Sequence, residues 1–261
     1  MSGNVTLITG ASSGIGAELA RVFAAKGHRL ALTARRVERL EALSQEIAGK
    51  GCEKPIVIAC DLEQKGAADV IAAALEAASL EVEYLVNNAG FGLAGDAVRR
   101  SREEQLALID VNIRSLTDLT LRFADQVIAH RGGILNVGSL AGFVPGPGMA
   151  AYYASKAFVV SFSEALHEEL RERGVRVTAL CPGPVASEFQ SRSGARLEPA
   201  MLAIPAQAVA HAGYCGLMKN RTLVLPGFGN RLAVALLPFI PRALLLAAVG
   251  RFQRRRRKQQ R

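Results

Sequence analysis

Two side chains that exchange protons lie four residues apart, at Tyr152 and Lys156. On a helix this spacing places both on one face. Free tyrosine and lysine have pKa values of about 10 and 10.4, so neither exchanges protons readily at neutral pH. An ammonium near the phenol favours the phenolate and lowers the tyrosine pKa, which suits proton transfer with an alcohol or carbonyl oxygen. The adjacent Tyr153 has Ala157 four residues later and faces about 100° away, so packing is its expected role.

A glycine-rich segment follows the first apolar run and precedes a stretch with helical spacing. Glycine permits a tight turn and close approach to an anion, and a helix N-terminus supplies free N–H groups and a positive dipole end. The spacing is G-x-x-x-G-x-G rather than the commoner G-x-G-x-x-G, and alone it also fits a plain strand-to-helix turn. Together with motifs further along, it predicts a dinucleotide site. Its residues are Gly10, Ser12, Ser13, Gly14, Ile15 and Gly16.

The end of the second apolar run bears on which dinucleotide binds. Sheets that bind NAD usually place an acidic residue there to hold the ribose hydroxyls. This chain has Ala34, Arg35 and Arg36 instead, and arginine can bind a 2′-phosphate through parallel charge-assisted hydrogen bonds. We therefore expect NADP(H), with Arg35 as the main phosphate ligand and Arg36 beside it. The alternative is that Arg36 only begins a solvated helix face with Arg39.

Apolar runs and amphipathic segments alternate along most of the chain. We expect strands over residues 4–9, 29–33, 55–60, 84–87, 134–137, 175–181 and 222–225, and helices over 15–26, 36–50, 67–78, 103–129, 152–173 and 205–219. Apolar strands separated by helices indicate a parallel sheet covered on both faces. Right-handed crossovers then favour an α/β fold with one doubly wound, Rossmann-type domain over residues 1–229. A C-terminal extension follows over residues 230–261, and the irregular stretch 184–204 has the length of a lid or binding loop.

Five motifs stand in the order and spacing of a known family. The first is the glycine-rich turn. Asn87-Asn88-Ala89-Gly90 follows the fourth expected strand and Ser139 follows the fifth. The Tyr152/Lys156 pair begins the next long helix, and Pro182-Gly183 closes the sixth strand. Over residues 5–227 the chain resembles the classical short-chain dehydrogenase/reductase family. The resemblance implies an enzyme that interconverts an alcohol and a carbonyl with a nicotinamide cofactor.

The resemblance also implies roles for single residues. Tyr152 is the catalytic acid/base, Lys156 is its partner and holds the nicotinamide ribose, and Ser139 binds the carbonyl oxygen. Asn112 is the fourth catalytic residue and holds a water that links Lys156 to solvent. In reduction, hydride passes from the nicotinamide to the carbonyl carbon while Tyr152 protonates the oxygen. The other implied cofactor contacts are Asp61, Leu62, Asn88, Ala89, Gly90, Pro182, Gly183, Val185 and Ser187, the last standing where the family often has threonine.

Three segments are expected around the reacting carbon: 91–94, 140–149 and 184–204. Their side chains include Phe91, Leu93, Phe143, Val144, Met149 and Phe189. This apolar set favours a lipophilic substrate, such as a long-chain, isoprenoid or steroid-like alcohol or ketone. Two alternatives remain open: these loops are apolar because they fold over the cofactor, or Glu188, Gln190 and Arg192 orient a polar group.

The C-terminal extension differs from the rest of the chain. Residues 232–249 are almost wholly apolar, but Pro238, Pro241 and Arg242 argue against a membrane-spanning helix. The last eleven residues hold seven Lys or Arg and no acid, out of a net charge of +9. Such a sequence is typical of an in-plane anchor on an anionic membrane. Alternatively, the apolar part covers the substrate cleft or joins subunits and the basic run is a disordered end. The run lacks interleaved aromatic residues, so nucleic-acid binding is not expected.

Composition limits the remaining function classes. The 261 residues, 50% of them hydrophobic, suit one folded α/β domain. No secretory signal is expected, and the four cysteines and four histidines lack metal-binding or redox spacing, so we expect a reducing, cytoplasmic location and no metal. A homo-oligomer is implied by the family resemblance alone. A non-catalytic NADP-binding sensor or scaffold and a membrane-surface interaction protein remain alternatives to an enzyme.

Overall fold

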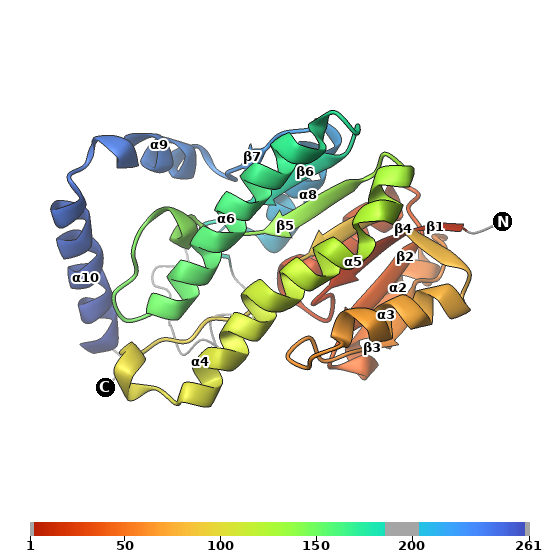
Figure 1. Ribbon diagram of the computed structural model, residues 1–261, viewed down its shortest axis with the longest axis horizontal. Coiled ribbons are helices and arrows are strands. Elements are labelled where there is room, and N and C mark those ends of the chain that lie inside the picture. Colours follow the sequence, from red (N-terminus) through yellow and green to blue (C-terminus); the bar gives the residue numbers. More distant parts are fainter. Residues whose placement is uncertain (1–2, 186–203, 259–261) are drawn as a thin grey trace.

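One parallel sheet forms the centre of the molecule (Figure 1). The computed structural model describes residues 3–185 and 204–258. The strands in this part are β1 (Gly3–Thr9), β2 (Leu30–Ala34), β3 (Ile56–Ala59), β4 (Leu80–Asn87), β5 (Gly133–Val137), β6 (Arg176–Leu180) and β7 (Leu223–Val224). Their order is β3-β2-β1-β4-β5-β6-β7, so the direction of winding reverses between β1 and β4. The predicted doubly wound α/β fold is confirmed.

Helices cover both faces of this sheet (Figure 1). One face carries α1 (Gly14–Ala25), α2 (Val37–Gly49) and α8 (Ala206–Met218), and the other carries α3 (Ala67–Ala77), α5 (Ser115–Ala129) and α6 (Ala150–Arg171). Phe23 and Leu40 are fully buried in the first layer, as are Ile71 and Phe123 in the second. Each helix buries the apolar stripe that its sequence repeats at helical spacing, and this burial is the main force that holds the layers together.

The helix expected over residues 103–129 is interrupted by a wider turn. The structure has α4 (Arg102–Ile109), then a π-helical segment, η2 (Asp110–Arg114), and then α5. A π-helical turn bonds to the fifth residue instead of the fourth and rotates the side chains around it. Here Asn112 lies in that turn and is buried. Its bonding partners lie elsewhere in the chain, so apolar periodicity could not predict the interruption.

Strand β4 begins at Leu80 instead of at the expected residue 84. Its first half alternates between buried and partly exposed side chains, with Glu81 and Glu83 at the exposed positions. It pairs there with the first residues of β1, where Gly3 lies beside Leu80. The two acidic residues interrupt the apolar run and hide this half of the strand from the sequence pattern.

The C-terminal extension forms three further elements. Helix α9 (Phe228–Leu236) is followed by the short 3-10 helix η5 (Leu237–Phe239) and by α10 (Arg242–Lys258). Pro238 and Pro241 lie between the two longer helices, where proline prevents one continuous helix. Figure 1 shows α10 at the end of the molecule farthest from the N-terminus. In the described part of the chain, no helix is long and apolar enough to cross a membrane.

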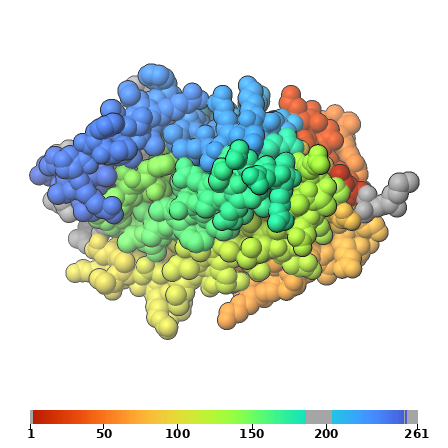
Figure 2. Space-filling model, turned by 45° about the horizontal axis from the view of Figure 1, so that its top comes forward, coloured from red at the N-terminus to blue at the C-terminus, as the bar shows by residue number. Residues whose placement is uncertain are grey.

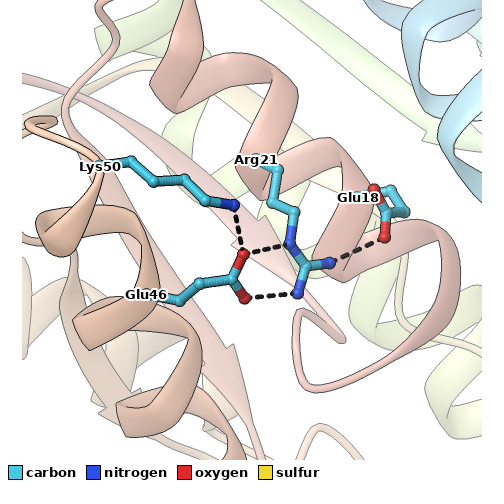
Figure 3. A network of polar contacts seen from close by, with 4 residues as sticks. All are labelled: Glu18, Arg21, Glu46 and Lys50. Atoms are coloured by element: carbon cyan, nitrogen blue, oxygen red, sulfur yellow. Dashed lines mark hydrogen bonds and ion pairs between the residues drawn. The ribbon is translucent and has the colours of Figure 1, made fainter.

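An ion-pair network joins α1, which follows the predicted phosphate turn, to the end of α2 (Figure 3). Arg21 binds both oxygens of Glu46, with Nε 2.9 Å from Oε1 and Nη2 2.7 Å from Oε2. Glu18 accepts from Arg21 Nη1 at 2.8 Å, and Lys50 donates to Glu46 Oε1 at 2.6 Å. The hydrogen bond from Arg21, followed by that from Lys50, lowers the pKa of Glu46 to about 2.

Removing the Glu46 charge tests this network. Because the side chain is about a third exposed, we expect Glu46→Gln to lower the free energy of unfolding by at most about 1 kcal/mol at pH 7. The carboxyl pKa is 4.5 when unperturbed and about 2 in the fold. Its stabilising contribution is therefore complete above pH 4.5 and is lost as the pH falls toward 2.

The measurement is urea unfolding of both proteins across this pH range. The stabilities of Glu46→Gln and wild type should converge at the acidic end. Glu41→Gln on the exposed side of α2 is the matched control and should leave stability unchanged. An equal loss in both variants would show that the network contributes nothing specific.

Candidate active site

The four predicted catalytic residues lie on elements that meet at the carboxyl edge of the sheet. Ser139 follows β5 and begins the 3-10 helix η3 (Leu140–Phe143), while Tyr152 and Lys156 lie on the first turns of α6. Asn112 lies in η2. Ligands of doubly wound sheets bind beyond this edge, at the point where the winding reverses.

Tyr152 is buried, and burial is the dominant influence on its acidity. It raises the pKa of the phenol to about 12, against the lowering effect of a hydrogen bond with Ser139. The raised pKa belongs to the protein without its cofactor, and the lowered pKa expected beside a charged Lys156 and a bound oxidised cofactor stays a prediction. Lys156 does not contribute to the shift. The phenol is accordingly protonated at neutral pH and is a proton donor.

Lys156 is buried beside the end of β5. Its Nζ donates a hydrogen bond to the carbonyl oxygen of Val137 at 2.8 Å. Burial lowers the pKa of its ammonium to about 8, because desolvation disfavours the charged form. The same Nζ lies 3.5 Å from the point where a Cβ on Gly90 would stand. The amine therefore reaches the segment after β4 as well as the strand end.

Asn112 holds that segment in place. Its Oδ1 accepts from the backbone N–H of Phe91, and its Nδ2 donates to the carbonyl oxygen of Phe91, each at 3.0 Å. The same Nδ2 is 3.0 Å from Ser155 Oγ on α6. The amide thus ties η2 to both the Gly90–Phe91 backbone and the catalytic helix. Sequence reasoning assigned Asn112 a bound water; the structure gives it these three direct bonds.

The glycine-rich turn packs against the segment after β4. A Cβ on Gly16 would stand 2.4 Å from both Asn88 Nδ2 and the carbonyl oxygen of Gly10, so only glycine fits there. Gly10 and Gly14 have φ angles of +63° and +56°, which glycine adopts without strain. Ser13 is the N-cap of α1, yet its side chain makes no capping bond. The first N–H groups of α1 thus lack a side-chain cap, as a phosphate site requires.

Thr9 and Asn88 join the glycine-rich turn to the segment after β4. Thr9 Oγ1 accepts from the backbone N–H groups of Asn88 and Ala89, each at 3.0 Å. Asn88 Nδ2 donates back to the carbonyl oxygens of Thr9 at 2.9 Å and Gly10 at 3.2 Å. These bonds hold the glycine-rich turn beside Gly90. The predicted cofactor residues of the turn and of the Asn88–Gly90 segment are therefore brought together.

Arg36, rather than Arg35, contacts the glycine-rich turn. Its Nη2 donates to the hydroxyl oxygens of Ser12 at 3.2 Å and Ser13 at 3.0 Å. The Arg35 side chain is 56% exposed and its Nη1 lies 4.0 Å from Glu63 Oε2. Arg35 is the predicted main phosphate ligand, yet Arg36 is the one that contacts the turn. Arg36 stands at the start of α2 and points back toward the serines before α1.

Further predicted cofactor residues lie along the same edge. Leu62 is buried, and Asp61 Oδ1 accepts from the N–H of Glu63 at 3.2 Å. Beyond β6, the carbonyl oxygen of Pro182 accepts from Leu140 N at 3.0 Å, which ties this turn to η3. Gly183 is closely covered, since a Cβ there would stand 2.9 Å from Asn230 Nδ2.

Val185 is buried and forms a bridge to Ile204. This bridge joins the two ends of the predicted binding loop. Ser187, Phe189 and the polar side chains Glu188, Gln190 and Arg192 lie outside the described residues. Elsewhere in the described ranges, no group of three His, Cys, Asp or Glu side chains is placed to hold a metal ion.

The substrate side of Tyr152 is apolar. Leu108, Met149 and Tyr152 form a buried cluster. Partly buried apolar residues pack against it, namely Phe91, Leu93, Ala94, Ala141, Ala151 and Tyr153. Three of the predicted substrate residues, Phe91, Leu93 and Met149, belong to this cluster or pack against it, and their role toward the substrate stays a prediction. Phe143 packs instead against the cluster of Val160, Ala179 and Cys181.

A contact from the C-terminal extension reaches this cluster. Gln253 on α10 is buried, and its Nε2 donates to the Tyr153 hydroxyl at 3.0 Å. The Tyr153 ring lies edge-on to Tyr152, with centroids 6.0 Å apart, and packs so tightly over Gly146 that a Cβ there would collide with it. The packing role expected for Tyr153 is thus found, and one of its partners lies a hundred residues away.

Several supporting residues were missed by sequence reasoning. Asn87 and Asn136 are buried on adjacent strands and joined by a 2.9 Å bond between Nδ2 and Oδ1. Asn136 in turn donates to Ser163 on α6 at 2.9 Å, while Ser155 donates to the carbonyl oxygen of Tyr152 at 2.7 Å. Buried polar groups need such partners. An asparagine inside an apolar strand is the signal that could have identified Asn136.

Known proteins share this fold and much of this sequence. A family model described as short chain dehydrogenase matches residues 4–198. Sulfoacetaldehyde reductase of Chromohalobacter salexigens is 43% identical over 186 residues, which are 70% of this chain and 72% of that protein. A short-chain dehydrogenase of Sphingobium yanoikuyae in complex with NADPH has a TM-score of 0.82 and 32% identity, covering 90% of this chain and 92% of that one. The bulky-bulky ketone specific alcohol dehydrogenase of Comamonas testosteroni has a TM-score of 0.77 and 30% identity, covering 93% and 97%.

The matched region carries the arrangement described above. Residues 4–198 include the glycine-rich turn, the segment after β4, Ser139 and the Tyr152/Lys156 pair. These three relatives are named as a reductase and as dehydrogenases. The chain therefore belongs to the short-chain dehydrogenase/reductase family, whose members exchange hydride between a nicotinamide dinucleotide and an alcohol or carbonyl group, and it is an oxidoreductase that acts on CH–OH groups.

Proposed function

We propose that this enzyme uses NADP(H) to interconvert a bulky, lipophilic carbonyl compound and its alcohol. The observation that carries the proposal is the buried apolar cluster around Tyr152, which includes Leu108 and Met149. An apolar wall beside the proton donor suits a substrate that places hydrocarbon there, since burying it stabilises the complex. The ketone specificity in the name of the Comamonas testosteroni enzyme, which matches 93% of this chain, agrees with it.

In the proposed mechanism, the protein positions and protonates the substrate oxygen. The bound cofactor supplies the hydride when it is reduced and accepts it when it is oxidised. Tyr152, protonated at neutral pH, donates its proton to the carbonyl oxygen. Ser139, already hydrogen-bonded to this phenol, stabilises the charge that develops on that oxygen. Lys156 supplies a cation beside Gly90, and Asn112 holds the Phe91 backbone in place.

The NADP(H) preference rests on the two arginines after β2. Arg36 lies against the Ser12 and Ser13 hydroxyls, and Arg35 stands beside it without an acidic residue at the strand end. We propose that Arg36 makes the main contact to the 2′-phosphate and that Arg35 assists. The NADPH complex of the Sphingobium yanoikuyae relative supports this choice.

Three further expectations remain proposals. A cytoplasmic location is proposed from the cysteine pattern and the start of the sequence, and a homo-oligomeric state from the family resemblance. Contact of the C-terminal extension with a membrane is favoured by exposed apolar side chains on α9 and α10. A purely non-catalytic, cofactor-binding role is the main competing function, and the variants below separate it from catalysis.

Replacing Tyr152 with phenylalanine tests the proton donor. We expect Tyr152→Phe to reduce kcat for ketone reduction by roughly 10²- to 10⁴-fold, the usual contribution of a general acid, with NADPH affinity retained. Reduction by wild type should hold up to about pH 8 and decline above it as Lys156 loses its proton. Steady-state kinetics from pH 6 to about 10 and NADPH fluorescence titration measure both effects. Tyr153→Phe is the matched control and should keep most turnover. Wild-type binding of NADPH without any turnover would favour the non-catalytic role.

Exchanging the arginines tests the cofactor preference. A charge-assisted hydrogen bond contributes about 1.5–3 kcal/mol, so Arg36→Gln should raise the Kd for NADPH by roughly ten- to a hundredfold. The Kd for NADH should change little. Arg39→Gln, one turn later on the same helix, is the control for a general charge effect. A larger loss in Arg35→Gln than in Arg36→Gln would reverse the proposed order of the two residues.

A series of 2-alkanones tests the substrate class. Each buried methylene contributes about 0.8 kcal/mol, so kcat/KM should rise roughly fourfold per added carbon until the cluster is filled. Leu93→Asn should flatten this dependence, while Leu106→Asn, at an exposed position on α4, should not. A higher kcat/KM for sulfoacetaldehyde than for every ketone in the series would refute the lipophilic class and favour a small anionic substrate.

A further inference from the structure

The C-terminal helices expose several large apolar side chains. On α9, Phe228, Leu232 and Leu236 are 80%, 50% and 50% exposed and lie four residues apart, on one helix face. Phe239, 82% exposed, follows in η5. We call these residues, together with Ile240, Leu244 and Leu246, the C-terminal apolar surface. Figure 2 shows the C-terminal segment on the surface at one end of the molecule.

Helix α10 has two different faces. Leu245 and Val249 are partly buried and Gln253 is buried, so this side packs against the protein. The opposite side exposes Leu244 near the start of the helix and Arg251 further along. The outward face therefore changes from apolar to cationic along the helix. Folding of the monomer alone does not explain this face, because folded monomers usually bury large apolar side chains.

The charge of the whole chain resides in the same segment. Residues 227–261 contain nine Lys or Arg and no Asp or Glu, which equals the formal net charge of +9 for the complete chain. The remaining residues are neutral overall. Arg242 and Arg251 are exposed beside the C-terminal apolar surface. Apolar and cationic groups are thus concentrated together, at one end of an otherwise neutral domain.

We propose that the C-terminal apolar surface binds an anionic lipid bilayer, with α9 and α10 lying in the headgroup plane. A bilayer offers acyl chains to the apolar side chains and phosphate groups to the cations, so one partner satisfies both. A second copy of the chain would satisfy only the apolar part, because it brings a segment of the same positive net charge, and like charges repel. Nucleic acid would satisfy only the cations.

Helix α10, whose outward face carries part of this surface, reaches toward the active site with its inward face. Gln253 on α10 donates to Tyr153, whose ring contacts the catalytic Tyr152. A bilayer beneath α10 would therefore lie close to the apolar cluster that we propose for the substrate. This part of the inference rests on the proposed function: a lipophilic ketone dissolved in the bilayer would reach the site without crossing water. Lipid binding itself does not depend on catalysis.

Vesicle flotation of the full-length protein tests the docking. Wild type should float with vesicles of phosphatidylcholine and phosphatidylglycerol at least tenfold more than with pure phosphatidylcholine. The binding should weaken when salt is raised from about 0.1 to 0.5 M, because salt screens the cations. The triple variant L236Q/F239S/L244Q and the double variant R242E/R251E should each lose flotation at least tenfold. All five positions are exposed, so the fold should persist.

The matched control replaces exposed apolar residues elsewhere. V70Q/V98Q/L121Q removes side chains that are 56%, 95% and 67% exposed and should float as wild type does. Absence of flotation by wild type, or equal flotation by the triple variant and this control, would overturn the docking. So would a wild-type dimer that the triple variant dissociates without any lipid binding, or duplex DNA that binds as tightly as the vesicles.

Activity measurements separate this inference from the proposed function. Each protein is assayed with NADPH and the same ketone, either free in buffer or dissolved in anionic vesicles. Wild type should reduce the vesicle-borne ketone at least tenfold faster than the triple variant does, with equal rates for the ketone in buffer. Flotation without any ketone reduction would leave the docking intact and refute the proposed function. Ketone reduction without flotation would do the reverse.

Discussion

The bonds between the ends of β1 and β4 are the constraint on which the site depends. The winding of the sheet reverses between these strands, so the elements that follow them diverge to opposite faces and leave a crevice. Thr9 and Asn88 close the base of that crevice with four hydrogen bonds between side chains and backbone. Next to it, Asn112 fixes the positions of Phe91 and Ser155 by hydrogen bonds. Each step pairs a buried polar group, which would otherwise destabilise the fold.

Desolvation then determines the protonation of the catalytic groups. Burial raises the pKa of Tyr152 to about 12 and lowers that of Lys156 to about 8, so it disfavours the charged form of both. It likewise raises the pKa of the adjacent Cys181 thiol to about 12. The phenol, the amine and the thiol thus share a site in which new charge is costly. A proton donor kept neutral in this way suits a reaction that generates negative charge on a carbonyl oxygen.

The C-terminal extension adds contacts and exposed apolar side chains to the fold. The family match ends at residue 198, whereas the Comamonas testosteroni enzyme matches 93% of this chain in structure. Beyond the match, α10 contacts Tyr153 through Gln253 and presents exposed apolar side chains to the outside. Function resides in sites built on a fold rather than in the fold itself. Here the predicted catalytic residues lie at the sheet edge, and the extension contacts their neighbour Tyr153.

The sequence by itself determined the sheet, its strand segments and the chemistry-bearing residues. Continuous apolar runs indicate strands that are buried on both faces of the sheet. Motif residues such as Gly16 and Tyr152 can be found because they lie at a set distance from the start or end of an element. It did not determine the π-helical turn at Asn112 or the start of β4 at Leu80, because both depend on partners far along the chain.

The tertiary structure alone decided which groups meet. It placed Arg36 rather than Arg35 on the serines of the turn and brought Gln253 to Tyr153. It also buried Tyr152, which raises the pKa of the phenol in the protein without its cofactor. Spacing along a helix shows which side chains share a face, but desolvation depends on what covers that face, and only the packing of distant segments supplies the cover.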